Sequence, residues 1–343
     1  MSSTQTPRNV SIRLAALTAL LGLSLLPASV FGQGCVIARG GGSAAINDGA
    51  GYLQKGKWEV TIAARHFVSD RHFVGDDEQT HRTALGTEVI NKSYFADVTT
   101  TYGWSERLNL SLSMPFSRHD RSSMRENVRV HTQAHGLGDI RVGANYWLLN
   151  PASDNRGNIS VGFGVKIPTG DAEAQDVFNY PSGAVLRYVD SSIQPGDGAW
   201  GATVELQSFY HIWGNLSAYG NGFYLFNPDE RNEATGWSIP DGYMVRGGLA
   251  YRVSAVRGLG ISLGLRNEGV VAHDLFGGNL GRRRPGFAVS VEPGVTYSKG
   301  RYSGALTVPI AIHRNRVTSF GSTRAGDAAF ADYTFNASFS MRL

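Results

Sequence analysis

Residues that could bind a metal ion or act as general acids and bases gather between positions 66 and 81. This stretch holds three histidines and four acidic residues: His66, His72 and His81, with Asp70, Asp76, Asp77 and Glu78. Imidazole and carboxylate groups are common metal ligands, so this spacing could hold a cation. An acidic, hydrated loop accounts for the same residues more simply, and we expect no metal site and no cofactor.

Other patterns that carry chemistry in proteins are weak in this chain. His131 and His135 stand close together, but in a region expected to be a loop. Gly162-Phe-Gly164 and Gly258-Leu-Gly260 lie in or beside expected strands and open no helix, which excludes a nucleotide-binding loop. The formal net charge of +4 is too small to indicate a nucleic-acid partner.

An alternation of apolar and polar residues is the most informative feature. From Leu108 to Met114 the chain reads Leu-Asn-Leu-Ser-Leu-Ser-Met. Because successive side chains of a strand point to opposite faces, such a segment has one apolar and one polar face. The segment at 216–226 is the least regular, and its faces cannot be assigned. Twelve segments share the alternation: 58–64, 94–102, 108–116, 140–148, 159–167, 200–206, 216–226, 245–253, 261–265, 287–295, 302–312 and 333–341.

The apolar face of these segments is rich in aromatic residues, which is typical of strands that face lipid outside and water inside. Tight connections near 104–106, 213–214, 255–258 and 299–300 alternate with long polar ones. Outer-membrane barrels have short periplasmic turns and long extracellular loops. We therefore predict an all-β fold: a single antiparallel, up-and-down transmembrane β-barrel of about 12 strands over residues 57–343, monomeric in the bacterial outer membrane. A soluble β-sandwich is the alternative fold.

The N-terminal residues have the composition of a secretory signal peptide. Arg8 and Arg13 precede an apolar run from Leu14 to Leu26, and small residues follow up to Gly32. That run is shorter than the ~20 residues that a transmembrane helix needs. We assign residues 1–32 to the signal peptide and 33–56 to an arm that lies in the periplasm or in the lumen. The single cysteine, Cys35, excludes an internal disulfide.

Strand parity also predicts which charged residues point into the barrel. Acids and bases are nearly balanced among them, so they could form a structural network or line a path for a small solute. We expect Asp139, Arg141, Lys166 and Glu205 to form a mixed-charge cluster that narrows the lumen. The lumen candidates are Glu59, Arg65, Asp97, Asp139, Arg141, Lys166, Glu205, Arg246, Arg252, Arg266, Glu268 and Glu292.

Basic residues cluster in two of the long connections. One cluster is Arg118, Arg121 and Arg125, and the other is Arg282-Arg283-Arg284. On the cell surface they could face lipopolysaccharide phosphates, which arginine binds well. Solvated charged loops are an equally simple explanation. Expected partners are thus outer-membrane lipid and lipopolysaccharide, the barrel assembly machinery and a small-molecule solute.

Several short motifs resemble those of a known family. They are Ser69-Asp-Arg-His-Phe-Val-Gly75, Gly136-Leu-Gly-Asp-Ile140, Tyr146-Trp-Leu-Leu149, Gly164-Val-Lys-Ile-Pro-Thr-Gly-Asp171 and Gln194-Pro-Gly-Asp-Gly198. With these motifs the chain resembles the bacterial outer-membrane barrels grouped with the phenol-degradation meta-pathway transporters. The resemblance implies a barrel that passes small, often aromatic, compounds across the outer membrane, and it implies no particular binding residues.

The expected function is therefore uptake of small molecules, hydrophobic or aromatic ones included, by passive or facilitated diffusion. A structural or surface-interaction barrel without transport is one alternative. An outer-membrane lipid-modifying enzyme is the other, but the chain lacks the His-x-Ser-Asn sequence of an outer-membrane phospholipase. We expect no enzyme activity.

Overall fold

The computed structural model describes residues 52–150, 156–277, 279–319, 321–322 and 326–343. The predicted signal peptide, Cys35 and all but the last residues of the predicted arm lie outside these ranges. Those last residues meet the start of the barrel: Gly56 N donates to Gly103 O at 2.7 Å, and Leu53 is buried. No helix in the described part of the chain is both long and apolar enough to span a membrane.

The strands form one closed antiparallel sheet, because β17 pairs with β1, with Ile62 opposite Phe339. The barrel has the twelve strand positions that the sequence predicts. Position eleven is split because Pro309, which has no N–H to donate, separates β15 from β16. The strands are β1 (Trp58–Val74), β3 (Ile90–Gly103), β4 (Leu108–Arg125), β6 (Ile140–Trp147), β7 (Gly157–Ile167), β10 (Gly201–Trp213), β11 (Leu216–Phe226), β12 (Gly242–Arg252), β13 (Leu259–Val270), β14 (Gly286–Lys299), β15 (Tyr302–Thr307) with β16 (Ile310–Asn315), and β17 (Ala328–Arg342).

The outer face of this wall is apolar, as the alternation predicts. In β13, for example, Ile261, Leu263 and Leu265 are exposed, whereas Arg266 is buried. The irregular alternation at 216–226 has a structural cause in β11. Tyr219 and Phe223 point inward and are buried, and Phe223 packs against Met244 of β12. The inner wall therefore has an aromatic patch beside its charged residues.

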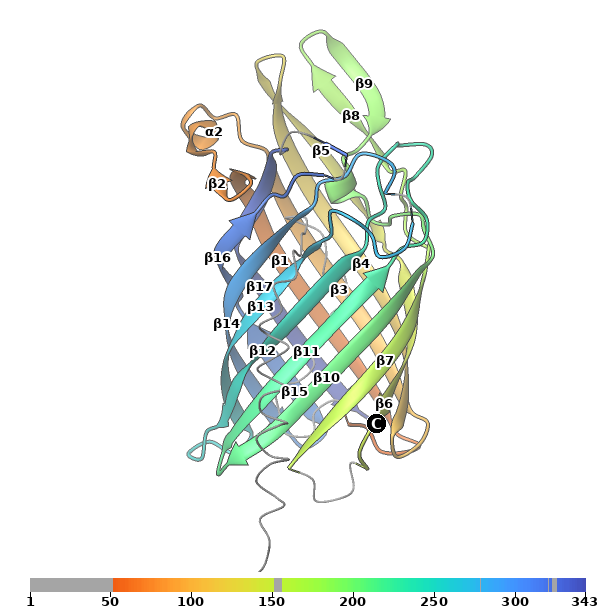
Figure 1. Cartoon of the computed structure of the whole chain (residues 1–343), viewed down its shortest axis with the longest axis vertical. Coiled ribbons are helices and arrows are strands. Elements are labelled where there is room, and N and C mark those ends of the chain that lie inside the picture. Colours follow the sequence, from red (N-terminus) through yellow and green to blue (C-terminus); the bar gives the residue numbers. More distant parts are fainter. Residues whose placement is uncertain (1–51, 151–155, 278, 320, 323–325) are drawn as a thin grey trace, which may run out of the picture. The chain divides into compact units, whose positions relative to one another are not determined.

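The two ends of the barrel differ, as Figure 1 shows. The tight connections, such as those between β10 and β11 and between β14 and β15, gather at the lower end, which we call the turn end. Gly214 and Gly300 in these two connections have positive φ. The long connections gather at the upper end, which we call the loop end. This arrangement matches the alternation of short and long connections in the sequence, and by the general rule for such barrels the loop end is extracellular.

Several regions predicted as loops contain regular structure. Strand β4 continues to Arg125 and turns through Glu126 and Asn127, both with positive φ, into β5 (Val128–Leu137). The connection after β7 carries a hairpin of β8 (Gln175–Tyr180) and β9 (Gly183–Tyr188), followed by the 3-10 helix η1 (Ser191–Ile193). The first long connection holds β2 (Asp77–Glu78) and α2 (Thr80–Ala84). Beyond the membrane both faces of a strand meet water, so the apolar–polar alternation is lost there.

Candidate functional site

Five charged side chains form a continuous chain of ion pairs inside the barrel, which we call the lumen ion chain. They alternate in sign: Arg65, Glu268, Arg266, Glu292 and Arg246. Glu268 lies 3.2 Å from Nη2 of Arg65 and 2.8 Å from Nη2 of Arg266. Glu292 lies 2.8 Å from Nη1 of Arg246 and 3.5 Å from Nη1 of Arg266.

The lumen ion chain joins two separate parts of the wall. Arg65 lies on β1, whereas the other four members lie on β12, β13 and β14, which are separated from β1 by β17 and the β15–β16 position. The guanidinium of Arg65 therefore reaches Glu268 through the lumen rather than along the sheet. The contact therefore crosses part of the lumen and narrows it.

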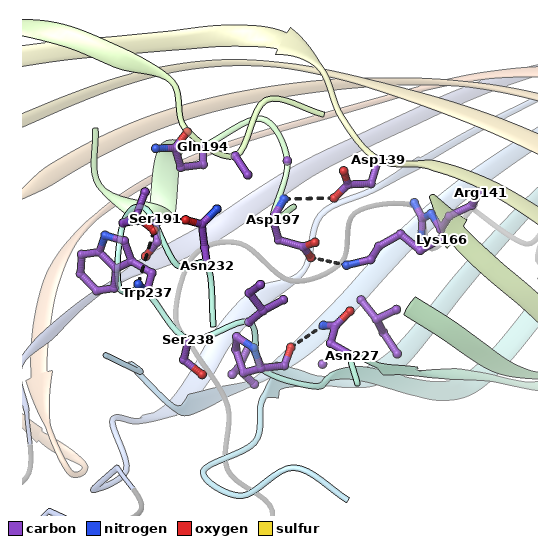
Figure 2. Close-up of a pocket in the computed structure, with 18 residues that line it drawn as sticks. Asp139, Arg141, Lys166, Ser191, Gln194, Asp197, Asn227, Asn232, Trp237 and Ser238 are labelled. Atoms are coloured by element: carbon purple, nitrogen blue, oxygen red, sulfur yellow. Dashed lines mark hydrogen bonds and ion pairs between the residues drawn. The ribbon is translucent and has the colours of Figure 1, made fainter. Parts of the chain in front are cut away.

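A second charged cluster lies nearer the loop end, where β6 begins and β7 ends. The Lys166 ammonium forms an ion pair with Asp197, whose backbone N–H donates to Asp139 at 3.1 Å. The other Asp139 oxygen accepts from Gly170 N at 3.1 Å. Arg141 interacts electrostatically with Glu205. Figure 2 shows Asp139, Arg141, Lys166 and Asp197 grouped on one side of a pocket.

Residues 189–199, which we call the mouth segment, are folded into the opening at the loop end. Val189, Ile193 and Ala199 are fully buried, and the first two pack against Ala134 of β5 and Ala174. Burying these apolar side chains, at ~1.5–3 kcal/mol for each of the larger ones, favours the inserted position.

Asp190 fastens the mouth segment to both sides of the barrel. Its carboxylate lies 2.5 Å from Nη2 of Arg284, just before β14, and 3.3 Å from Nη2 of Arg121 on β4. These strands are separated in the sheet by β3, β1, β17 and the β15–β16 position. Burial alone would raise the pKa of Asp190, but Arg284 and Arg121 outweigh burial and hold that pKa well below its usual range.

Trp237, in the connection between β11 and β12, is linked to the mouth segment through Arg284, the partner of Asp190. Arg282 and Arg284 lie over this indole with their guanidinium carbons 4.7 and 4.6 Å from the ring centroid. Arg283 turns inward and forms a buried ion pair with Asp274. The loops at the mouth therefore form one packed unit held by cation–π contacts and ion pairs.

Beneath these loops lies a pocket of about 120 Å³, which we call the mouth pocket. Its walls combine three kinds of group. Apolar side chains come from Leu225, Ile239 and Val270, and polar uncharged ones include Gln194, Asn227 and Asn232. The charged members are Asp139, Arg141, Lys166 and Asp197. The pocket can thus hold a small molecule that has both an apolar body and a polar group.

Eleven of the twelve lumen candidates fall into three groups by position, and Asp97 lies apart from them. Arg65, Arg246, Arg266, Glu268 and Glu292 make the lumen ion chain, and Asp139, Arg141, Lys166 and Glu205 lie together near the loop end. At the turn end, Glu59 accepts from Nε of Arg342 at 2.7 Å, and Arg252 is exposed. Asp97 lies opposite Ala63 of β1 and Pro115 of β4.

The basic loop clusters need a correction. Arg118, Arg125 and Arg282 are exposed, but Arg121 and Arg284 bind Asp190, and the side chain of Arg283 is only 2% exposed. The expectation that Arg283 faces the cell surface is therefore wrong. A buried guanidinium requires a carboxylate partner, and Asp274 supplies it from the same connection.

The histidines do not gather around a cation. His72 Nε2 accepts from Val89 N at 2.8 Å, so Nδ1 carries the hydrogen and donates to Asp327 at 2.7 Å. His66 stacks on Tyr94 with ring centroids 4.2 Å apart. Within the described residues no group of three His, Cys, Asp or Glu side chains could hold a metal ion.

Sequence reasoning did not identify Asp190, Trp237 or Asp274 as functional residues. All three lie in connections, where parity gives no information. Asp197 had one signal, since it lies in the Gln194–Gly198 motif that carries part of the family resemblance.

The closed barrel, its apolar outer face and its charged lumen define the class of protein: a bacterial outer-membrane β-barrel. No protein-family model and no curated protein matches the sequence. Among solved structures, an outer-membrane channel from Pseudomonas putida F1 matches with a TM-score of 0.60 and 12% identity, covering 87% of this chain and 100% of that one. This similarity shows the shared fold.

Two further structures match less well. The translocator domain of the autotransporter NalP from Neisseria meningitidis has a TM-score of 0.42 and 14% identity, covering 97% of this chain and 98% of that one. A Pseudomonas aeruginosa FadL homologue has a TM-score of 0.40 and 9% identity, covering 91% and 99%. At these TM-scores the likeness supports no argument about this chain.

Proposed function

We propose that this protein is an outer-membrane channel through which small molecules, hydrophobic or aromatic ones included, cross by passive or facilitated diffusion. The observation that carries the proposal is the mouth pocket, which has apolar, uncharged polar and charged walls and lies inside the loop end of a closed barrel. The solved channel of the same fold and the resemblance to the phenol-degradation group support the same assignment. We also propose that the protein works as a monomer, is inserted by the barrel assembly machinery and is surrounded by outer-membrane lipid and lipopolysaccharide.

The lumen architecture favours a selective channel over a wide pore. The lumen ion chain crosses the interior, and the mouth segment fills the opening. Both restrict the passage of large or strongly hydrated solutes. A purely structural barrel would need neither a pocket under its loops nor charged groups around that pocket.

Uptake into whole cells tests the proposal. In cells that lack their general porins, expression of the protein should raise the initial uptake rate of a labelled one-ring aromatic solute several-fold over vector-only cells. Val270→Trp places a large ring in the mouth pocket and should return uptake to the vector level. Leu263→Trp, on the lipid-facing side of the same strand, is the matched control and should behave as the wild type.

Two results would overturn the proposal. One is wild-type uptake equal to that of vector-only cells at verified outer-membrane expression. The other is equal uptake by the Val270→Trp and Leu263→Trp variants, because the solute would then bypass the pocket. A heat-modifiable shift on a gel shows that each variant is folded.

A further inference from the structure

We propose that the mouth pocket binds a small organic carboxylate, of about the size of one aromatic ring, whose carboxylate replaces that of Asp197 on Lys166. The inference rests on the proposed function and deepens it, because it assigns a substrate class to the pocket.

The two partners of this ion pair are held very differently. Lys166 belongs to β7, and its side chain is only 5% exposed, whereas that of Asp197 is 31% exposed. The Lys166 stem packs so closely on Gly201 that a Cβ there would lie 2.8 Å from Cε of the lysine. Asp197 instead lies in a connection, before Gly198, which has a φ of +82°. The ammonium is therefore fixed, and the carboxylate is the partner that can move.

Asp197 can release Lys166 without unfolding its loop. Its backbone N–H donates to Asp139 at 3.1 Å, and Gly196 N donates to Asp171 O at 2.9 Å. The Asp197 side chain makes one backbone bond of its own, because its Oδ1 accepts from Ala199 N at 3.1 Å. A rotation of that side chain towards solvent would free the Lys166 ammonium at the cost of the Ala199 bond, while the bonds to Asp139 and Asp171 keep the loop in place.

The charge around the pocket favours an anion over a cation. Asp139 and Asp197 balance Arg141 and Lys166, so the four lining charges sum to zero. When Asp197 turns towards water, the pocket gains one positive charge, which a carboxylate neutralises. A cationic solute would have to displace the buried Lys166 or compete with the two backbone N–H donors on Asp139. Burying an uncompensated charge is costly, so the cation is disfavoured.

The other walls define the rest of the ligand. The mouth pocket, at about 120 Å³, is somewhat smaller than the cavity of about 150 Å³ that holds benzene, so one ring is the upper limit for the apolar body of the ligand. Leu225, Ile239 and Val270 offer an apolar surface for a ring or a short hydrocarbon chain. The amide of Asn232 offers a partner for a hydroxyl substituent. The pocket thus fits a small carboxylate with an apolar body.

Calorimetric titration of the full-length protein in detergent tests the inference with three probes of one shape: benzoate, benzyl alcohol and benzylamine. The wild type should bind benzoate at least about tenfold more tightly than either other probe, since one charge-assisted bond accounts for that factor. Asp197→Asn removes the competing carboxylate and should tighten benzoate binding about tenfold while changing benzyl alcohol binding less than about twofold. Lys166→Met should abolish the preference for benzoate.

Asp197→Asn keeps the size of the side chain and the backbone bond to Asp139, so the test does not depend on whether Lys166→Met folds. Equal affinity of the wild type for benzoate and benzyl alcohol would overturn the inference. So would an unchanged or weakened affinity of Asp197→Asn for benzoate. Uptake of neutral solutes without benzoate binding would refute only the inference. Benzoate binding without uptake of any solute would refute the proposed channel and leave the binding site.

Discussion

Arg65 on β1 and Glu268 on β13 are 203 residues apart in the chain, yet Nη2 of the arginine lies 3.2 Å from Oε1 of the glutamate across the barrel lumen. Glu268 also binds Arg266, which in turn reaches Glu292 and through it Arg246. The lumen ion chain gives each of its two carboxylates, Glu268 and Glu292, two guanidinium partners. It compensates the cost of keeping these groups away from bulk water and narrows the lumen at the same time.

Removing Arg65 should widen the lumen and change its charge. Arg65→Met deletes the crossing contact but leaves Glu268 paired with Arg266, so the barrel should fold. We expect single-channel conductance in planar bilayers to rise about twofold or more, with selectivity shifted towards cations because one positive charge is lost. Arg301→Met, at an exposed turn, is the control and should conduct like the wild type. Unchanged conductance of Arg65→Met would show that the ion chain lies outside the path.

Removing Glu292 should affect stability more than conductance. Its side chain is 1% exposed and lies between Arg246 and Arg266, so Glu292→Ala removes the carboxylate from the buried Arg246 and leaves Arg266 with Glu268 alone. We expect a loss of about 3–5 kcal/mol in the free energy of unfolding, measured by urea titration in lipid vesicles. The double variant Glu292→Leu with Arg246→Leu should lose less than Glu292→Ala alone. If the double variant were the less stable of the two, charge compensation would not be the cause.

The contact of Asp190 with Arg284 predicts how the mouth responds to pH. The pKa of Asp190 is held well below its usual range, after the opposing effect of burial. In an opened mouth the carboxyl would have its ordinary pKa of about 3.9. Because the pKa of Asp190 is lower in the closed mouth, its ionised carboxylate stabilises the closed state fully at pH values above the ordinary pKa. This stabilisation is lost progressively as the pH falls below that value. Open probability in planar bilayers should therefore be the same at pH 7 and pH 5 and should rise below about pH 4.

The same contact can be tested by substitution. Asp190→Asn should raise the open probability severalfold at neutral pH and remove the component of the acid response that comes from Asp190. Glu173→Gln changes an exposed carboxylate in the same connection and should leave both properties unchanged. A wild-type open probability in Asp190→Asn would mean that apolar packing of the mouth segment alone keeps it inserted.

Cysteine labelling distinguishes the two ends of the barrel and the two environments at the loop end. In a Cys35→Ser background, Arg125→Cys should react with an impermeant maleimide on whole cells, and Lys299→Cys should react only after the outer membrane is permeabilised. Ala199→Cys should stay unreactive in both cases because Ala199 is fully buried in the mouth segment. Labelling of position 299 but not 125 on whole cells would reverse the orientation. Rapid labelling of position 199 would show that the mouth is open.

The sequence by itself determined the barrel and the faces of most of its strands. A two-residue period has a local cause, since the backbone geometry of a strand sends alternate side chains to opposite sides. Ile261, Leu263 and Leu265 could therefore be placed outside, and Arg266 inside, without knowledge of any other strand. The faces of the strand at 216–226 could not be assigned in this way, because its inward side chains include Tyr219 and Phe223 and apolar residues therefore lie on both faces.

Only the tertiary structure decided the partners of the charged groups. Parity gives the face of Arg65 and Glu268 but neither their height in the barrel nor the direction in which a long side chain extends. In the connections even the face is undetermined: Arg282, Arg283 and Arg284 are identical in type, yet the first is exposed, the second binds Asp274 and the third binds Asp190. Their roles depend on which distant carboxylates the closed sheet brings to the mouth. The residues next to them in the sequence do not indicate which carboxylates those are.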